Sequence, residues 1–323
     1  MARIKKKPIP KQIRGAADSK ERISNIDHGH DLFGEKVEKI PVLKERYSWY
    51  PINVLYTPHP DWDRRRRKWR DYLLIGEDNY GLQAAEIEEQ LNFDKYKGGQ
   101  GISKTKIASE AVFDPMLLEV LADWYCPEGG SIIDPFNGSH VSAGVFSKLG
   151  YKYTGIDIRQ QIIDQNNEKL SRICPELSWT YLCGPSQFVL DELAFEEFDL
   201  FNSCPPYANL VRYSNNKDDI SNMDYYEFVS LYRVIIAKCS ALLKRGGYAT
   251  ITIGQVRDKK TGGLLPFRED TIRAFQDCGM LYYNDIPLIG PIGSGAIRAK
   301  GTFERGMGKL VNVHQIVLIF KKI

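Results

Sequence analysis

The stretch 131–149, SIIDPFNGSHVSAGVFSKL, decides the fold of this chain. It begins as a short buried strand, turns at a polar segment that contains Gly138, and continues as an apolar helix from Val141 to Leu149. A loop that joins a parallel strand to the next helix lies at the carboxyl edge of the sheet, where such sheets bind ligands. The sequence therefore predicts an open α/β sheet with a ligand loop at Asp134–His140.

Strands and helices alternate on both sides of this stretch. The predicted helices cover 113–124, 162–173, 225–243 and 270–278, and the predicted strands cover 153–156, 179–182, 198–202, 248–253, 281–285 and 313–320, with a glycine-rich loop at 293–308. This order predicts a doubly wound, mostly parallel sheet of about seven strands.

The composition indicates a folded core with an extension at its N-terminal side. Of 323 residues, 43% are hydrophobic and 26% are charged, which is typical of a globular protein. Residues 1–45 mix Lys, Pro, Gly and Asp and predict a basic flexible arm. Residues 46–110, with a charged helix from Asp61 to Leu74, predict an accessory region. The α/β domain is expected at 111–323.

Charge, apolar runs and cysteines exclude several classes of protein. The formal net charge is only +3, but the basic residues cluster, above all in the run Arg64–Lys68. No apolar run reaches the length of about eighteen residues that a membrane span needs, and no secretory signal is visible, so a cytoplasmic protein is expected. The six cysteines lack metal-type spacing and predict free thiols.

Two features around the predicted ligand loop suit a nucleoside ligand. Gly138 lets the backbone approach a ligand closely, and the N–H groups at the start of the following helix can meet a carboxylate. Asp157 ends the next strand, which is the usual place for an acid that accepts hydrogen bonds from ribose hydroxyls. The alternative is that Gly138 only relieves a tight turn and that Asp157 caps a helix.

The strand at 198–202 ends in Ser203-Cys204-Pro205-Pro206-Tyr207. Two consecutive prolines cannot continue a central strand. The stiff turn is expected to hold backbone carbonyls and the Tyr207 ring at the sheet edge, next to the ligand loop.

These segments resemble the amino-methyltransferases of DNA, and within them the phage-type DNA modification methylases known from restriction–modification systems. That family has a short F-D-P motif, a D-P-F-x-G-x-G motif and a catalytic (Asp, Asn or Ser)-Pro-Pro-(Tyr, Phe or Trp) motif. The matching pieces here are Phe113–Pro115, Asp134–Ser139 and Cys204–Tyr207, and Leu243–Gly247 matches the turn before the fifth strand. The resemblance covers roughly residues 110 to 323.

The resemblance implies a Rossmann-like class I fold that binds S-adenosylmethionine. Phe113 and Asp114 would lie near the methionine part of the cofactor, Asp134 and Gly138 beneath it, and Asp157 at the ribose. The cofactor-binding residues that the resemblance implies are Phe113, Asp114, Asp134, Pro135, Phe136, Asn137, Gly138, Ser139, Asp157 and Ser186.

The implied reaction is methyl transfer to the exocyclic amine of cytosine (N4) or adenine (N6) in a base flipped out of DNA. The Pro205 carbonyl would accept a hydrogen bond from the amine, Tyr207 would stack on the base, and Cys204 or Ser203 would add a weaker polar contact. The catalytic residues are thus expected to be Ser203, Cys204, Pro205, Pro206 and Tyr207, and transfer is expected to be direct.

Three positions depart from the family pattern and leave alternatives open. His140 replaces the last glycine, Gly184-Pro185-Ser186 stands where relatives have Gly-Asp-Ser or Gly-Asp-Ala, and Cys204 begins the catalytic motif. A thiol is also the nucleophile for methylation at carbon 5 of cytosine, although those enzymes place their cysteine after a proline. Methylation of RNA or protein, and a catalytically silent DNA-binding module, are further alternatives.

DNA is the expected partner, and its contacts are expected outside the catalytic motifs because no large insertion separates them. The DNA-binding candidates are Arg64, Arg65, Arg66, Arg67, Lys68, Arg298 and Lys300. For the basic segment Arg64–Arg70, a solvated helix face balanced by Asp61, Asp63 and Asp71 is the alternative. A homodimer is a further option, no metal site is expected, and no nuclease motif is visible in the chain.

Overall fold

The computed structural model describes residues 53–76, 112–207, 213–214, 216–258, 260–292, 295–304, 308 and 310–323. The predicted arm at 1–45 and most of the accessory region at 46–110 therefore lie outside the described residues. The strands are β1 (Leu55–Tyr56), β2 (Ser131–Asp134), β3 (Lys152–Asp157), β4 (Thr180–Cys183), β5 (Phe198–Ser203), β6 (Leu243–Ile253), β7 (Met280–Ile289) and β8 (His314–Lys322).

These strands form one eight-stranded sheet in the order β1-β7-β8-β6-β5-β2-β3-β4. Strands β2 to β6 run parallel to one another, whereas β8 is antiparallel to both β6 and β7. The chain moves outward from β2 to β4 and then returns to place β5 on the other side of β2. The predicted doubly wound, mostly parallel sheet is confirmed, with the short edge strand β1 added beside β7.

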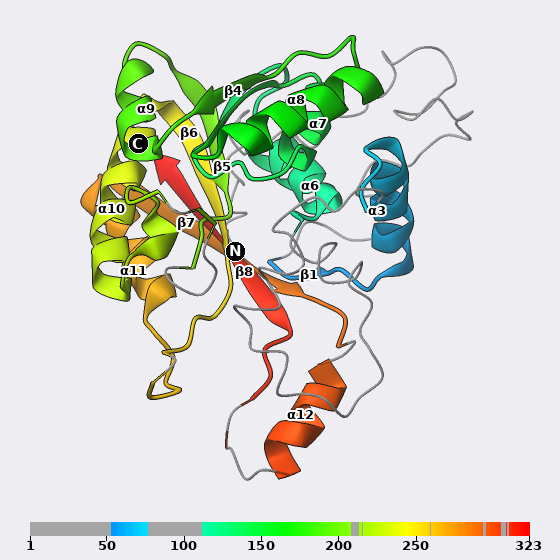
Figure 1. Cartoon of the computed structure of the whole chain (residues 1–323), viewed down its shortest axis with the longest axis vertical. Helices are drawn as coiled ribbons and strands as arrows, with labels where there is room; N and C mark the ends of the chain where they lie inside the picture. Colours follow the sequence, from blue (N-terminus) through cyan, green and yellow to red (C-terminus); the bar gives the residue numbers. More distant parts are fainter. Residues whose placement is uncertain are drawn as a thin grey trace, which may run out of the picture.

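Helices cover both faces of the sheet (Figure 1). They are α3 (Pro60–Tyr72), α6 (Pro115–Tyr125), α7 (Val141–Lys148), α8 (Gln160–Ile173), α9 (Ser186–Glu192), α10 (Tyr225–Leu242), α11 (Phe267–Asp277) and α12 (Gly295–Glu304), with a 3₁₀ turn η5 (Ile220–Asn222). Neighbouring strand residues face opposite layers, as the strand period of two requires. Ile133 and Phe201 pack toward α9, α10 and α11, and Ile132 and Leu200 pack toward α3, α6, α7 and α8.

Three local predictions were wrong or incomplete. The predicted glycine-rich loop at 293–308 contains α12, because Arg298, Ala299 and Lys300 favour a helix and outweigh the flanking glycines. The predicted turn at Leu243–Gly247 belongs to an extended β6, whose pairing with β5 shifts register between Phe198 and Leu200. Helix α9 and strand β1 were not predicted. None of the helices in the described ranges has the length and apolarity needed to cross a membrane.

Helix α3 is packed onto the α/β domain at its C-terminal end. Leu73 is fully buried, and its backbone carbonyl accepts a hydrogen bond from His140 Nε2 at 2.9 Å. The next carbonyl, that of Leu74, accepts from Lys169 Nζ at 3.0 Å. A side chain at Gly144 of α7 would meet the Leu73 side chain at 2.6 Å, so the glycine permits the close approach of the two helices.

This packing predicts a coupling between positions 73 and 144. Gly144→Ala should destabilise the protein by about 1–2 kcal/mol, because overpacking outweighs the helix-propensity gain of alanine. In a Leu73→Ala background the 2.6 Å clash is removed and only a 3.2 Å contact with Leu170 Cδ2 remains, so the same change should destabilise the protein less than it does in the wild type. Urea denaturation of the four proteins measures the coupling free energy. Additive effects would contradict this packing of α3 on α7.

Candidate active site

A cleft of about 1360 Å³ opens at the carboxyl ends of the parallel strands. The loop after β2 (residues 135–139), the end of β3 (Asp157–Arg159), the start of α9 and the turn after β5 (residues 204–207) line it together. The order of strands reverses between β2 and β5, and ligands of open α/β sheets bind at such a point. The topology thus brings the predicted cofactor segments and the predicted catalytic turn into one space.

The loop after β2 is held in place by hydrogen bonds to residues of β3 and α8. Gly138 has φ +65° and open space where a side chain would begin, which suits a backbone that a ligand approaches. The Asn137 side chain accepts from the Tyr153 hydroxyl at 2.7 Å, and its backbone N–H donates to the Ile156 carbonyl at 2.9 Å. The Asn166 side chain of α8 donates to the Gly138 carbonyl at 2.8 Å. Pro135, Phe136, Asn137, Gly138 and Ser139 all line the cleft.

Asp134 lies beneath this loop and is 1% exposed, so it supports the site from below. Its Oδ1 accepts from the Phe136 backbone N–H at 2.9 Å and from Ser203 Oγ at 2.6 Å. Burial raises the pKa of Asp134 to about 6, against the lowering effect of these hydrogen bonds. Ser203 is fully buried and donates inward, so of the predicted catalytic residues it is the one that does not line the cleft.

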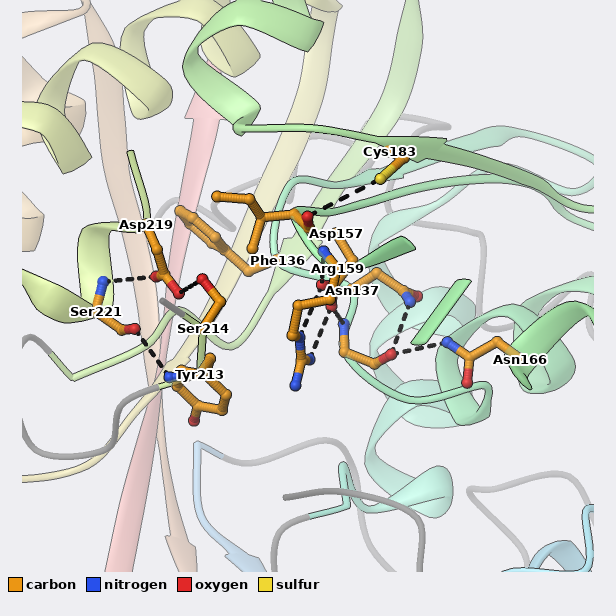
Figure 2. A network of polar contacts seen from close by, with 12 residues as sticks. Phe136, Asn137, Asp157, Arg159, Asn166, Cys183, Tyr213, Ser214, Asp219 and Ser221 are labelled. Carbon is orange, nitrogen blue, oxygen red and sulfur yellow. Dashed lines mark hydrogen bonds and ion pairs between the residues drawn. The ribbon is translucent and has the colours of Figure 1, made fainter. Parts of the chain in front are cut away.

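Asp157 ends β3 and lines the cleft, and Figure 2 shows its carboxylate beside the Arg159 side chain. Its Oδ2 accepts from the Gly138 backbone N–H at 3.2 Å, which ties the end of β3 to the loop after β2. Arg159 forms a two-pronged ion pair with the same carboxylate, with Nε–Oδ1 and Nη2–Oδ2 distances of 3.0 Å. The Arg159 guanidinium also lies over the Tyr213 ring at 5.5 Å from its centre.

The segment after β4, Gly184-Pro185-Ser186, borders the cleft. Ser186 Oγ donates to the Pro135 carbonyl at 2.5 Å, and the Gly184 N–H donates to the Asp157 carbonyl at 3.0 Å. Pro185, Ser186 and Gln187 line the cleft. The Ser186 hydroxyl is therefore engaged with the loop after β2. Gln187 contributes a side-chain amide to this part of the cleft lining.

The turn after β5 presents Cys204, Pro205, Pro206 and Tyr207 to the cleft. The Tyr207 hydroxyl accepts from the Gly254 backbone N–H at 3.1 Å and from Gln315 Nε2 at 3.5 Å. The Tyr207 ring meets the Phe267 ring edge to face, with centres 5.8 Å apart. Contacts from β8 and α11 and a residue just past β6 thus hold this ring in one orientation.

The Cys204 thiol lies in a protected position at this turn. Its Sγ is 3.7 Å from the Tyr207 hydroxyl oxygen. Burial raises the pKa of the thiol to about 11, so it stays protonated at neutral pH. A nucleophilic cysteine requires the thiolate, and the usual devices that lower a thiol pKa are a nearby cation or a helix N-terminus. The environment of Cys204 therefore disfavours its use as a nucleophile.

Phe113 and Asp114 line the opposite wall of the cleft, at the start of α6. Asp114 caps this helix, accepting from the Met116 N–H at 3.0 Å. Its second oxygen accepts from Trp62 Nε1 at 3.0 Å and lies 3.6 Å from Arg66 Nη1. Helix α3 therefore contributes directly to this wall.

The predicted DNA-binding residues occupy different places. Arg64 and Arg67 are exposed and pair with Asp61 and Asp63 on their own helix. Arg65 pairs with Glu119 of α6 through two 2.9 Å contacts, and Arg66 lines the cleft. Lys68 is on the same helix, and Arg298 and Lys300 lie exposed on α12.

Several cleft residues carried no recognisable signal in the sequence. Arg159 follows Asp157 closely, and a basic residue beside a ribose acid is the one hint that could have been used. Tyr213, Gln187 and Gln315 come from segments with no motif. Gln315 is brought to Tyr207 only because β8 inserts between β6 and β7.

The residues present fit an adenosyl cofactor that carries an amino acid. Asp157 and the Gly138 backbone suit ribose hydroxyls, and Phe136, Ile158 and Ile220 supply apolar wall to the cleft. Asp114 and Arg66 supply opposite charges on the far wall. Among the described residues, no cluster of three or more side chains is suited to a metal ion.

Comparison with known proteins gives similarity at the level of solved structures. No family model matches the sequence, and no curated protein matches it. TrmN from Thermus thermophilus aligns over 65% of this chain at 17% identity and a TM-score of 0.45. The alignment covers 49% of TrmN, so the chain spans about half the length of that protein.

Two further solved structures also align with this chain. Magnesium protoporphyrin IX methyltransferase from Synechocystis PCC 6803, with bound SAM, aligns over 78% of this chain and 97% of its own at 9% identity and a TM-score of 0.43. A second Thermus thermophilus protein, with the provisional assignment of DNA modification methylase, aligns over 43% of this chain and 52% of its own, at 20% identity and a TM-score of 0.31. Similarity this distant does not identify the reaction, which has to be inferred from the residues that line the cleft.

The raised pKa of Asp134 predicts a pH dependence of stability. Because the native carboxyl has a pKa of about 6 against the usual value of 3.8, native protein binds this proton more tightly than unfolded protein. The contribution is therefore present below pH 3.8 and is lost as pH rises through about 6. Asp134→Asn should match the wild type at pH 4 and exceed it by up to about 3 kcal/mol at pH 7.5. Denaturant unfolding at both pH values measures this difference, and parallel pH profiles would contradict it.

Proposed function

We propose that this protein is an S-adenosylmethionine-dependent methyltransferase that acts on the exocyclic amine of a DNA base. One observation carries the proposal: the loop after β2 and the Cys204-Pro205-Pro206-Tyr207 turn line the same cleft. The 2.6 Å hydrogen bond from Ser203 to Asp134 joins them. A cofactor loop and a rigid turn that orients an amine are the two parts that direct methyl transfer needs.

On the cofactor side, the proposed roles follow from the placement of each group. Bound S-adenosylmethionine would supply an electrophilic methyl group. Asp157 would accept hydrogen bonds from the ribose, and the Gly138 backbone would let the cofactor lie close to the sheet edge. Asp134 touches no ligand in this scheme, because it is buried and positions the loop through Phe136 and Ser203.

On the acceptor side, the turn after β5 would orient the amine. The Pro205 carbonyl would accept a hydrogen bond from the amine and so point the nitrogen lone pair toward the methyl group. The Tyr207 ring, held by Gly254, Gln315 and Phe267, would stack on the flipped base. Cys204 would stay a neutral thiol, which argues against the carbon-5 mechanism and for direct transfer.

Exposed cations near the cleft support DNA as the substrate. Arg64 and Arg67 project from α3, and Arg298 and Lys300 project from α12. Pro291 and Asn312, which lie before and after α12 in the chain, line the cleft, and Figure 1 shows α12 projecting away from the sheet between β7 and β8. Phosphate contacts by such residues would hold a duplex over the cleft.

The reaction is tested by following labelled methyl groups. Incubation with methyl-labelled S-adenosylmethionine and DNA, followed by digestion to nucleosides, should place the label on N4-methylcytosine or N6-methyladenine. The Cys204→Ser variant should retain activity within about tenfold, because a hydroxyl preserves the polar contact that direct transfer requires. Both results follow from an amine mechanism with a neutral residue at position 204.

Label on 5-methylcytosine, with complete loss of activity in Cys204→Ser, would refute the amine mechanism. RNA and protein substrates assayed in parallel test the other class of acceptor. Label in RNA or protein but not in DNA would overturn the choice of substrate while leaving the methyltransferase proposal intact.

DNA binding by the exposed cations predicts a change in salt dependence. The plot of log affinity against log salt should lose about 0.9 in slope for each phosphate contact removed. Arg298→Ala and Lys300→Ala should each flatten this slope, and the double variant should flatten it further. Asp218→Asn, a change at a half-buried residue of the cleft lining that removes no cation, is the control. An unchanged slope in the double variant would show that α12 makes no phosphate contact.

A further inference from the structure

The basic run on α3 is divided by the geometry of the helix. Arg64 and Arg67 point outward, with side chains 71% and 74% exposed. Arg65 points into the domain, is 12% exposed, and pairs with Glu119. Arg66 and Arg70 both line the cleft and lie four residues apart, hence on one helix face. The basic run that looks like one patch in the sequence therefore lies in three different environments: solvent, the contact with α6, and the cleft.

The cleft-facing pair is held at a fixed place. Trp69 Nε1 and Arg65 donate to the Glu119 carboxylate of α6 at 2.5 and 2.9 Å. Leu73 packs on α7, and its carbonyl accepts from His140 just after the cofactor loop. Because α3 is attached to both α6 and α7, its inner face cannot swing away from the cleft without breaking these contacts.

Positively and negatively charged side chains lie close together where α3 and the start of α6 border the cleft. Arg66 Nη1 lies 3.6 Å from Asp114 Oδ2, and Arg66 Nη2 contacts Asp63 Oδ1 at 2.6 Å. Arg70 adds a second guanidinium-bearing side chain to the lining of the cleft. Two guanidiniums and the Asp114 carboxylate thus border the same cleft as the loop after β2, and the hydrogen bond between Leu73 and His140 ties α3 to the end of that loop. This charge pattern is complementary to an α-amino acid, which carries one carboxylate and one ammonium.

We propose that Arg66 and Arg70 bind the carboxylate of the cofactor's amino-acid part, with Asp114 accepting from its ammonium. Guanidinium groups form paired hydrogen bonds with carboxylates, and these are stronger than contacts between neutral groups. The inference rests on the proposed function and deepens it, because it assigns part of the basic run to the cofactor rather than to DNA. Helix α3 is then a wall of the cofactor site.

Two ligands distinguish recognition of the amino-acid part from a general effect on binding of the adenosyl group. S-adenosylhomocysteine carries the amino-acid part, and 5′-methylthioadenosine lacks it. Without DNA, Arg66→Gln and Arg70→Gln should each weaken S-adenosylhomocysteine binding by about tenfold or more, and leave the affinity for 5′-methylthioadenosine within about twofold. Arg64→Gln and Arg67→Gln, matched changes on the outer face, should bind both ligands as the wild type does. Isothermal titration calorimetry measures each affinity.

Each of the other possible results would contradict a specific part of the proposal. If the wild type binds neither ligand, the proposed function itself fails. If it binds both and the Arg66 and Arg70 variants keep full affinity for S-adenosylhomocysteine, this inference fails alone. Equal losses for both ligands also refute it, and thermal unfolding of the variants shows whether such losses come from misfolding. Reduced DNA affinity with unchanged S-adenosylhomocysteine affinity would return these arginines to the DNA contact.

Discussion

The hydrogen bond between Ser203 and Asp134 is the contact on which the site depends. The two residues end neighbouring strands, β5 and β2, on either side of the point where the strand order reverses. Their 2.6 Å contact is buried, and a buried polar pair of this kind is costly to break. Because Asp134 also accepts a hydrogen bond from the Phe136 N–H, one carboxylate sets the spacing between the proposed cofactor loop and the proposed catalytic turn.

Burial raises the pKa of two titratable groups near the proposed chemistry, with different consequences for each. For Asp134 it raises the pKa of a carboxyl that serves as a hydrogen-bond acceptor, which makes the site sensitive to pH. For Cys204 it raises the pKa of a thiol and keeps it protonated, which favours a polar or packing role over a nucleophilic one. The same desolvation therefore favours direct transfer of a methyl group over covalent catalysis at this turn.

The second organising feature is the attachment of α3 to the α/β domain. Its contacts with α6 and α7 turn part of a predicted accessory region into a wall of the cleft. Asp157 is likewise engaged within the protein, by Gly138 and Arg159 (Figure 2). A ribose bound there would share or displace the Arg159 contact, so the cofactor loop, β3 and the segment at Tyr213 are linked through one carboxylate.

The sequence by itself determined the alternation of strands and helices, the turn from strand to helix at Asp134–His140 and the stiff turn at Pro205-Pro206, because these depend on local periodicity and on the backbone limits of glycine and proline. It did not determine α12, where helix propensity competed with glycine. Only the tertiary structure decided which arginines of 64–70 face the cleft, that Ser203 points inward to Asp134, and that Gln315 reaches Tyr207. These contacts join residues far apart in the chain, and their partners follow from strand order and helix packing, which no local pattern encodes.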